Sequence, residues 1–178
     1  MLLRRPLITG CLVGFILWGA TATWGKNTFV QTSEDAISTT WKEGRMELIV
    51  PVNTWHNRNS YSHKQIDRYN ERPWGLGLAK TYVDDKANRH RLLALTFQDS
   101  FNKPEPTVGY SWQTVWRAEH TFRPTLGFVA GVTLRDSYHW IPIPAAIPIV
   151  GLDVGPFSAE TTYLLGFDVL FSWITWRF

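Results

Sequence analysis

The chain has 178 residues and a formal net charge of +3 at neutral pH. This charge is small and the basic residues are scattered, which argues against a nucleic-acid-binding protein. Ten Trp, ten Phe and six Tyr make the chain rich in aromatic residues, although its mean hydropathy is only −0.16. After the N-terminus, no apolar run approaches the ~20 residues that a membrane-spanning helix needs. These features suit a transmembrane β-barrel, in which only every second residue is apolar, or a lipocalin-like soluble barrel.

The N-terminal segment is ordered like a secretory signal peptide. Two arginines precede an apolar run at residues 7–18, and Ala-Thr-Ala at 20–22 resembles a cleavage site. We expect residues 1–22 to be removed on export and residues 23–178 to form a single domain. The only cysteine, Cys11, falls in the expected signal peptide, so the mature chain is predicted to contain no disulfide.

Residues 28–41 combine apolar side chains at helical spacing with polar residues on the opposite side. The apolar side chains near one side are Phe29, Ala36, Ile37 and Trp41. We predict a short amphipathic helix at about residues 28–41. Such a helix would lie at a membrane surface or pack on a soluble core, and this segment alone does not distinguish the two.

Eight segments of strand character follow, separated by turn and loop residues, as an all-β fold requires. One of them alternates most clearly, with Phe122 and Phe128 on an apolar face and Arg123 and Arg135 on the opposite face. Arginines on the inner face do not suit the core of a soluble barrel, whereas a membrane barrel has a polar interior. The predicted strands are residues 45–56, 74–83, 89–97, 107–117, 122–134, 144–152, 157–165 and 168–178.

The links between these strands are alternately long and short, apart from the last, which is typical of the outer loops and periplasmic turns of an outer-membrane barrel. The chain also ends on an aromatic strand with a terminal Phe178, which resembles the assembly signal of such barrels. We therefore predict an all-β fold, an eight-stranded antiparallel transmembrane β-barrel with a short N-terminal amphipathic helix. A closed barrel of eight strands is just wide enough for side chains or one slim ligand.

A polar group that includes Asp99 and Ser100 follows the third predicted strand. Pro104 and Pro106 come next and are expected to mark a loop. If the first strand rises from the periplasm, it ends with His56 at the outer rim. The third strand then brings Asp99 and Ser100 to the same rim, so residues more than forty positions apart are expected to converge.

These three residue types can carry acyl chemistry together. A histidine takes or gives a proton near neutral pH, a carboxylate can orient it, and a hydroxyl can act as a nucleophile or steady an oxyanion. His56, Asp99 and Ser100 are therefore candidate catalytic residues. The alternative for Asp99 and Ser100 is an ordinary loop cap, and four other histidines compete with His56 for a catalytic role.

Five motifs carry a resemblance to a known family. They are PVNTWH at 51–56, DRYNERPWG at 67–75, FQDSFNK at 97–103, GVTLRD at 131–136 and WIPIPAAIP at 140–148. Together they resemble the lipid A palmitoyltransferase family, PagP, from about Trp41 to the C-terminus. The resemblance implies an outer-membrane enzyme that moves a palmitoyl chain from a glycerophospholipid to the lipid A part of lipopolysaccharide. It also implies a monomer that needs no cofactor, metal or nucleic acid, with an acyl pocket in the outer half of the barrel.

By motif, the resemblance assigns the catalytic roles to His56, Asp99 and Ser100. Whether Ser100 forms an acyl intermediate or only aligns the ester stays open. The family has a glycine at the floor of its acyl pocket, where this sequence has Ser111. A hydroxymethyl group should raise that floor by roughly one or two methylenes, since a packed pocket resists added volume. The expected substrate is therefore palmitate bound less deeply, or a slightly shorter chain.

The resemblance also implies two lateral openings in the barrel wall. Pro51 and Pro73 match prolines that interrupt pairing between the first two strands, because a proline has no N–H to give to a ladder. Pro148 matches one side of a second opening, between strands six and seven, where the family's partner position holds Leu165 here. A polar pair at the rim is also implied, or an ordinary surface ion pair: Arg135 and Asp136.

Two other functions remain compatible with an eight-stranded barrel. A lipid A deacylase would use the serine and histidine to transfer an acyl chain to water instead of to a lipid. A non-enzymatic small barrel for adhesion or structure would explain the strands, but not a histidine and an Asp-Ser pair at one rim.

Overall fold

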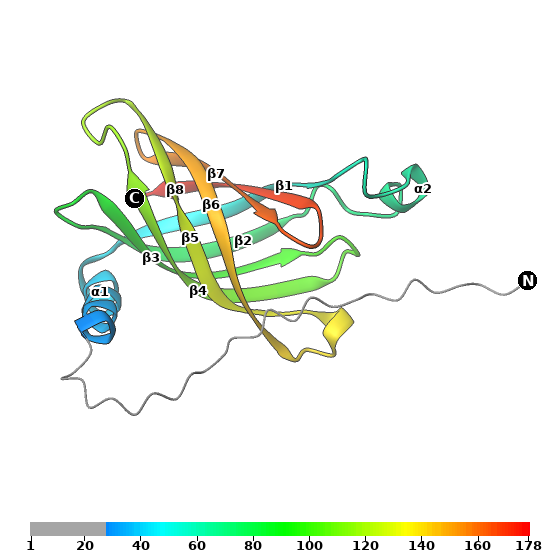
Figure 1. Cartoon of the computed structure of the whole chain (residues 1–178), viewed down its shortest axis with the longest axis horizontal. Helices are drawn as coiled ribbons and strands as arrows, with labels where there is room; N and C mark the ends of the chain where they lie inside the picture. Colours follow the sequence, from blue (N-terminus) through cyan, green and yellow to red (C-terminus); the bar gives the residue numbers. More distant parts are fainter. Residues whose placement is uncertain (1–27) are drawn as a thin grey trace, which may run out of the picture.

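The computed structural model describes residues 28–178 and forms a closed barrel of eight antiparallel strands in sequential order (Figure 1). The expected signal peptide, with Cys11, lies outside the described residues. The helices are α1 (Thr28–Glu43), α2 (His63–Ile66) and a 3-10 helix, η1 (Asp136–Tyr138). The strands are β1 (Arg45–His56), β2 (Gly75–Val83), β3 (Asn88–Gln98), β4 (Pro104–Val115), β5 (Phe122–Leu134), β6 (Pro142–Val154), β7 (Phe157–Leu164) and β8 (Val169–Arg177).

All eight predicted strands are present, and the predicted bounds of β1 and β5 are those observed. The expectation that Pro104 and Pro106 mark a loop is wrong, because both lie inside β4. They pair in register with Gln98 and Thr96 of β3, whereas pairing with β5 begins only at Thr107. At this level β4 therefore has a partner on one side only, and a proline can occupy it with its missing N–H on the free side.

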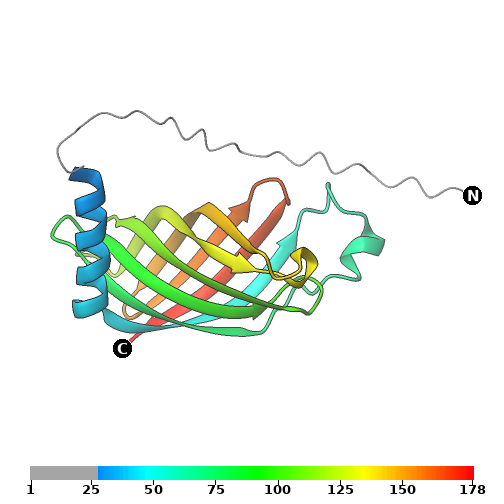
Figure 2. The ribbon, with the colours of Figure 1, turned by 90° about the horizontal axis from the view of Figure 1, so that it is seen from below.

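Helix α1 lies at one end of the barrel, and the connection that holds α2 lies at the other (Figure 2). In α1, the side chains of Ile37 and Trp41 are 42% and 65% exposed, so they are not packed on a core. The Trp41 backbone carbonyl accepts a hydrogen bond of 2.5 Å from Lys80 Nζ of β2, which also lies 5.1 Å from the indole centroid. This arrangement favours the membrane-surface alternative for the helix. No helix within residues 28–178 has the length and apolar character needed to cross a membrane.

Apolar side chains cover the outside of the barrel, and polar ones fill part of its inside. The lipocalin-like alternative does not fit, since a soluble barrel would bury its large apolar residues and expose its charges. Here Arg89, Arg91 and Glu47 are fully buried. The outward apolar residues, all at least 40% exposed, include Leu76, Leu78, Val108, Leu126, Phe128, Val150, Leu152, Ile174 and Trp176.

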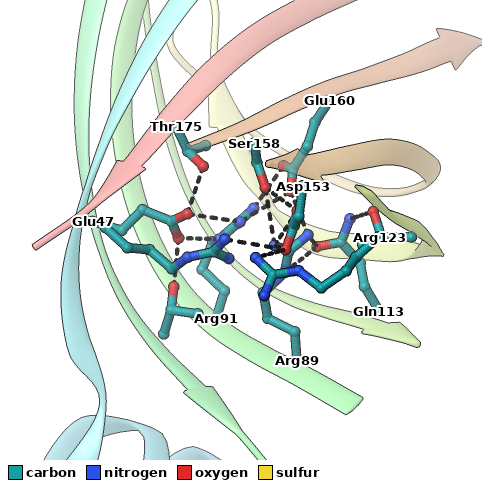
Figure 3. Close-up of polar contacts among 12 residues, drawn as sticks. Glu47, Arg89, Arg91, Gln113, Arg123, Asp153, Ser158, Glu160 and Thr175 are labelled. Atoms are coloured by element: carbon teal, nitrogen blue, oxygen red, sulfur yellow. Dashed lines mark hydrogen bonds and ion pairs between the residues drawn. The ribbon is translucent and has the colours of Figure 1, made fainter. Parts of the chain in front are cut away.

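An interior ion-pair cluster lies between the strands, in the half of the barrel nearer to α1 (Figure 3). Arg91 pairs with Glu47 and Glu160, with nitrogen–oxygen distances of 2.7 Å to each. Arg89 pairs with Glu160 at 2.7 Å and with Asp153 at 2.9 Å. Each charged group has an opposite partner, which buried ions require. Hydroxyl and amide groups complete the cluster, from Thr81, Gln113, Ser158 and Thr175.

Candidate active site

The candidate catalytic residues lie at the end of the barrel opposite α1. β1 ends at His56, and β3 ends at Gln98, immediately before Asp99 and Ser100. The two strands run in the same direction because β2 lies between them, antiparallel to both. The convergence predicted from strand direction is therefore observed.

A bulge in β1 decides which way His56 points. Glu47 and Ile49 face the barrel interior, and strict alternation would turn His56 toward the outside. The pairing of β1 with β8 shifts by one residue between Pro51 and Asn53, and beyond this shift Thr54 and His56 are the buried residues. A single extra residue reverses the two faces of a strand. His56 is thereby 2% exposed and faces inward.

His56 and Ser100 are in hydrogen-bond contact. His56 Nε2 lies 3.0 Å from Ser100 Oγ. This is the distance at which a histidine can accept the hydroxyl proton of a serine.

Asp99 does not contact His56. Its Oδ1 accepts hydrogen bonds of 2.8 Å from the backbone N–H groups of Phe101 and Lys103, and its Oδ2 lies 3.8 Å from Arg135. Asp99 thus holds the turn that carries Ser100, as the loop-cap alternative describes. The structure therefore brings His56 and Ser100 into direct contact, whereas Asp99 contacts the backbone of the turn next to Ser100.

The carboxylate beside His56 belongs to Glu71, which sequence reasoning missed. Glu71 Oε1 lies 3.2 Å from His56 Nδ1 and accepts a hydrogen bond of 3.0 Å from the His56 backbone N–H. Arg58 donates to both carboxylate oxygens at 2.6 Å. These hydrogen bonds, from Arg58 above all, lower the pKa of Glu71 to about 2. The signal that could have found it is its place within the DRYNERPWG motif.

Aromatic rings fix the imidazole plane. His56 stacks on Tyr69 with ring centroids 4.5 Å apart and meets the edge of Tyr61 at 5.4 Å. Tyr69 in turn packs edge-on against Phe101, beside Ser100. Tyr69 therefore covers one face of the histidine ring, and Tyr61 packs against both rings of this stack.

An apolar cavity of about 500 Å³ opens beneath His56 and Ser100. This volume lies within the usual range of ~300–1,000 Å³ for ligand pockets. Its polar groups gather at the mouth, near the reactive pair, and its deeper wall is apolar. A long hydrocarbon chain suits such a lining, with its ester end at the mouth. The deeper wall includes Ile49, Leu93, Leu95, Phe97, Val129, Ile147, Ile149, Val169, Phe171 and Trp173.

Ser111, the expected cavity floor, is fully buried but is not among the residues that line the cavity. It pairs in register with Arg91 on one side and Val129 on the other. Val129 lines the cavity, whereas Arg91 belongs to the interior ion-pair cluster. Ser111 therefore lies at the boundary between the two, and its Oγ has no hydrogen-bond partner within residues 28–178.

The β1–β2 wall is not hydrogen-bonded along its full height. Their ladder runs from Arg45 paired with Thr81 to Ile49 paired with Gly77 and stops there, although β1 continues to His56. Pro51 lies just beyond the last pair, and Pro73 is the buried residue two positions before β2 begins.

A second interruption separates β6 from β7. Their ladder ends at Val150 paired with Thr161, with β6 extending beyond it. Pro148 lies at this point, and its carbonyl accepts a hydrogen bond of 2.6 Å from Thr162 Oγ1. Leu165 is exposed in the turn between β7 and β8.

Arg135 and Asp136 lie at the rim without pairing with each other. Arg135 Nε is 3.1 Å from Glu105 Oε2, and Arg135 also lines the cavity mouth. Asp136 begins the 3-10 helix η1. Residues 28–178 contain no group of three or more His, Cys, Asp or Glu side chains arranged to hold a metal ion.

An apolar outer surface, a polar interior and a histidine–serine pair above an apolar cavity define an outer-membrane barrel with a site suited to acyl chemistry. Comparison with known proteins agrees. The family described as "Antimicrobial peptide resistance and lipid A acylation protein PagP" matches residues 36–175. The chain belongs to the PagP family.

Named relatives match over most of the chain. The "Lipid A acyltransferase PagP" of Laribacter hongkongensis is 44% identical over 153 residues, covering 84% of this chain and 74% of that protein. The "Lipid A acyltransferase PagP" of Salmonella typhimurium is 43% identical over 161 residues, covering 86% and 83%. The "Lipid A palmitoyltransferase PagP" of an Escherichia coli strain is 40% identical over 157 residues, covering 84% of each. Among solved structures, the Yersinia pestis outer membrane protein Ail matches with a TM-score of 0.39 at 12% identity, covering 76% of this chain and all of that one.

Proposed function

We propose that this protein is an acyltransferase of the outer membrane that moves a palmitoyl or slightly shorter chain from a glycerophospholipid to lipid A. The observation that carries this proposal is the contact of 3.0 Å between His56 Nε2 and Ser100 Oγ at the mouth of the apolar cavity. Membership of the PagP family, whose relatives are named lipid A acyltransferases, supports the choice of lipid A as acceptor. The protein acts as a monomer, with the His56 end of the barrel facing outward.

The reaction exchanges one ester for another. His56 Nε2 removes the proton from the attacking hydroxyl, whose oxygen bonds to the ester carbonyl carbon of the donor phospholipid. The bond from that carbon to the glycerol oxygen breaks, and the proton returns to the glycerol oxygen. One ester forms for each one lost, and no water is consumed. The attacking hydroxyl is Ser100 Oγ in a two-step route, in which a lipid A hydroxyl then attacks the acyl-serine ester and the proton returns to Ser100 Oγ as it leaves. In a one-step route the lipid A hydroxyl attacks the phospholipid ester directly, and Ser100 aligns the ester.

Lipid substrates reach this site sideways, from the membrane. The interruptions of the wall at Pro51 and at Pro148 lie at the level of the cavity, where Ile49 and Ile147 line it. An acyl chain can slide between two strands where no ladder hydrogen bonds hold them together. Arg135 at the cavity mouth is suited to hold a lipid phosphate, since a guanidinium can donate two parallel hydrogen bonds to the phosphate oxygens.

Substitution of the site residues tests the proposal. His56→Ala, Ser100→Ala and Asp99→Ala should each reduce acylation by at least roughly 10²–10⁴-fold, the usual contribution of general acid–base groups. For Asp99 the expected cause is loss of the turn that carries Ser100. His63→Ala is the matched control, because His63 is an exposed histidine of α2. The measurement is mass spectrometry of lipid A from cells with each folded variant.

The same spectra separate the competing functions. Transfer adds the mass of one acyl chain to lipid A, a deacylase removes one, and a non-enzymatic barrel leaves the spectrum unchanged. Normal acylation by any of the three folded variants would remove that residue from the site. Capture of an acyl group on Ser100 would establish the two-step route.

A further inference from the structure

We propose that Glu71 is the positioning residue of His56, fixing the proton on Nδ1 so that Nε2 is free to accept the Ser100 proton. The proposal rests on the proposed function for its kinetic consequence, but the position of the proton is a property of the protein alone. The proposal gives the two acidic residues different roles. Glu71 orients His56, and Asp99 holds the turn that carries Ser100.

Glu71 is bound to the end of β1 at two points. Its backbone carbonyl accepts a hydrogen bond of 3.0 Å from the Thr54 N–H. Its Oε1 accepts a hydrogen bond of 3.0 Å from the His56 N–H and lies 3.2 Å from His56 Nδ1. Because the same oxygen contacts both groups, moving it away from His56 Nδ1 would also break its hydrogen bond to the His56 backbone N–H.

Arg58 fixes the other side of the carboxylate. Its two terminal nitrogens lie 2.6 Å from the two oxygens of Glu71, and Nη1 also donates to the His56 carbonyl at 3.1 Å. A bidentate guanidinium sets both the position and the plane of a carboxylate. Glu71 is thus held between the histidine it contacts and an arginine two residues further along the chain.

The charge of Glu71 determines which ring nitrogen carries hydrogen. An ionised carboxylate only accepts hydrogen bonds, so the nitrogen that faces it must be protonated. A neutral histidine carries one ring proton, and placing it on Nδ1 leaves the Nε2 lone pair directed at Ser100 Oγ. The other groups that face the ring are the phenols Tyr61 and Tyr69, which pack against it through their rings.

Asp99 cannot take this role in the observed geometry. Its Oδ1 is occupied by two backbone N–H groups of its own turn and its Oδ2 is directed at Arg135. A purely structural role for Glu71, tying the loop to β1, would predict weaker substrate binding without any change in the histidine proton. The test therefore needs a readout of the proton as well as of the rate.

The experiment uses the full chain in detergent micelles, with Glu71→Gln as the main variant and Asp67→Asn as the matched control. Asp67 is an exposed acid of the same connection. Nitrogen-15 NMR of the histidine rings reports which ring nitrogen carries hydrogen, and the His56→Ala spectrum identifies the signal. Kinetics with a phospholipid donor and lipid A give kcat and KM.

Wild-type protein and Asp67→Asn should show hydrogen on Nδ1 of His56. In Glu71→Gln this preference should be lost, because an amide can accept or donate, and kcat should fall by roughly 10²-fold or more with little change in KM. Glu71→Asp, which keeps the charge but withdraws it by one methylene, should recover part of kcat.

Hydrogen on Nε2 in the wild type would overturn the proposal without any variant. An unchanged proton position or a kcat within a few-fold of wild type in folded Glu71→Gln would also overturn it, as would a rise in KM alone. If the wild type transferred no acyl chain to lipid A, the proposed function would fail while the NMR result still decided the role of Glu71.

Discussion

Ser111 lies where the apolar cavity meets the interior ion-pair cluster. Its Oγ is buried without a hydrogen-bond partner within residues 28–178. A buried hydroxyl without a partner costs about 1–3 kcal/mol. Its neighbours Val129 and Arg91 belong to the cavity and to the cluster respectively. The side chain thus lies beside the cavity wall at Val129, and we expect its volume to limit how deep an acyl chain can reach.

Ser111→Gly should shift the preferred acyl chain to greater length without loss of catalysis. Each methylene is discriminated by about 1–3 kcal/mol in an apolar pocket, and overpacking against a rigid floor adds to this. The measurement is the chain-length profile of lipid A acylation with mixed phospholipid donors. The matched control is Ser172→Gly in β8, because the Ser172 side chain lies on the outward face of the barrel wall.

Identical profiles for Ser111→Gly and wild type would show that Ser111 does not limit depth. The floor would then be set by buried side chains that do line the cavity, such as Trp173 and Ile149. Trp173 is held in place there by a hydrogen bond of 2.7 Å from its Nε1 to Glu160 Oε2.

Single residues of the site were only partly predictable from sequence. His56 and Ser100 could be brought to one rim by counting strands. The inward orientation of His56 could not, because it depends on the bulge beside Pro51, and strict alternation gives the opposite face. Glu71 contacts His56 across fifteen positions in which the short helix α2 is the only regular element, so no periodicity relates the two residues. Asp99 was assigned to the site by motif, while its contacts are those of a turn.

The interrupted ladder between β1 and β2 predicts where a tether would block the reaction. Extending their register by one pair beyond Ile49 and Gly77 brings Val50 opposite Leu76, both exposed on the outside of the wall. A disulfide between Val50→Cys and Leu76→Cys should close the gap beside Pro51 and abolish turnover until it is reduced. Acylation before and after reduction is the measurement.

The control tether joins Leu48→Cys to Leu78→Cys, a pair that is already in the ladder. It adds the same crosslink without touching the gap and should leave turnover unchanged. Full activity with the Val50–Leu76 crosslink formed would mean that lipid passes elsewhere, with the interruption near Pro148 as the remaining candidate.

The strands themselves were well predicted because each carries its own alternation. β5 has thirteen residues of clean in–out order, and its predicted bounds match. The prolines of β4 were misassigned for a physical reason: the cost of a proline depends on whether a neighbouring strand pairs at that level. That information is absent from the strand's own sequence.

The interior ion-pair cluster links seven of the eight strands and predicts a large stability effect. Glu160 bonds to Arg89, Arg91 and Trp173, so Glu160→Ala leaves two buried guanidinium groups short of a partner. Breaking a buried ion pair in this way costs about 3–5 kcal/mol. Chemical unfolding in detergent micelles should show a loss of this size. Glu34→Ala, an exposed acid of α1, should change the unfolding free energy by less than about 0.5 kcal/mol.

A loss below about 1 kcal/mol for Glu160→Ala would mean that water replaces the carboxylate and that the cluster is hydrated. The polarity of this interior could be anticipated from the arginines of the predicted strands. Which acid meets which arginine could not, since Arg91 and Glu160 are 69 positions apart and come from different hairpins.

The closure of the barrel by β1 and β8 constrains the order of folding. Glu47 in the first strand hydrogen-bonds to Thr175 in the last, 128 positions away. No β1–β8 pair can form until nearly the whole chain is available, and contacts of such long sequence separation form slowly. Until then Thr175 and Trp173 of β8 cannot donate to Glu47 and Glu160, and the cluster is incomplete. The step that joins the last strand to the first is therefore also the step that gives these two buried carboxylates their remaining partners.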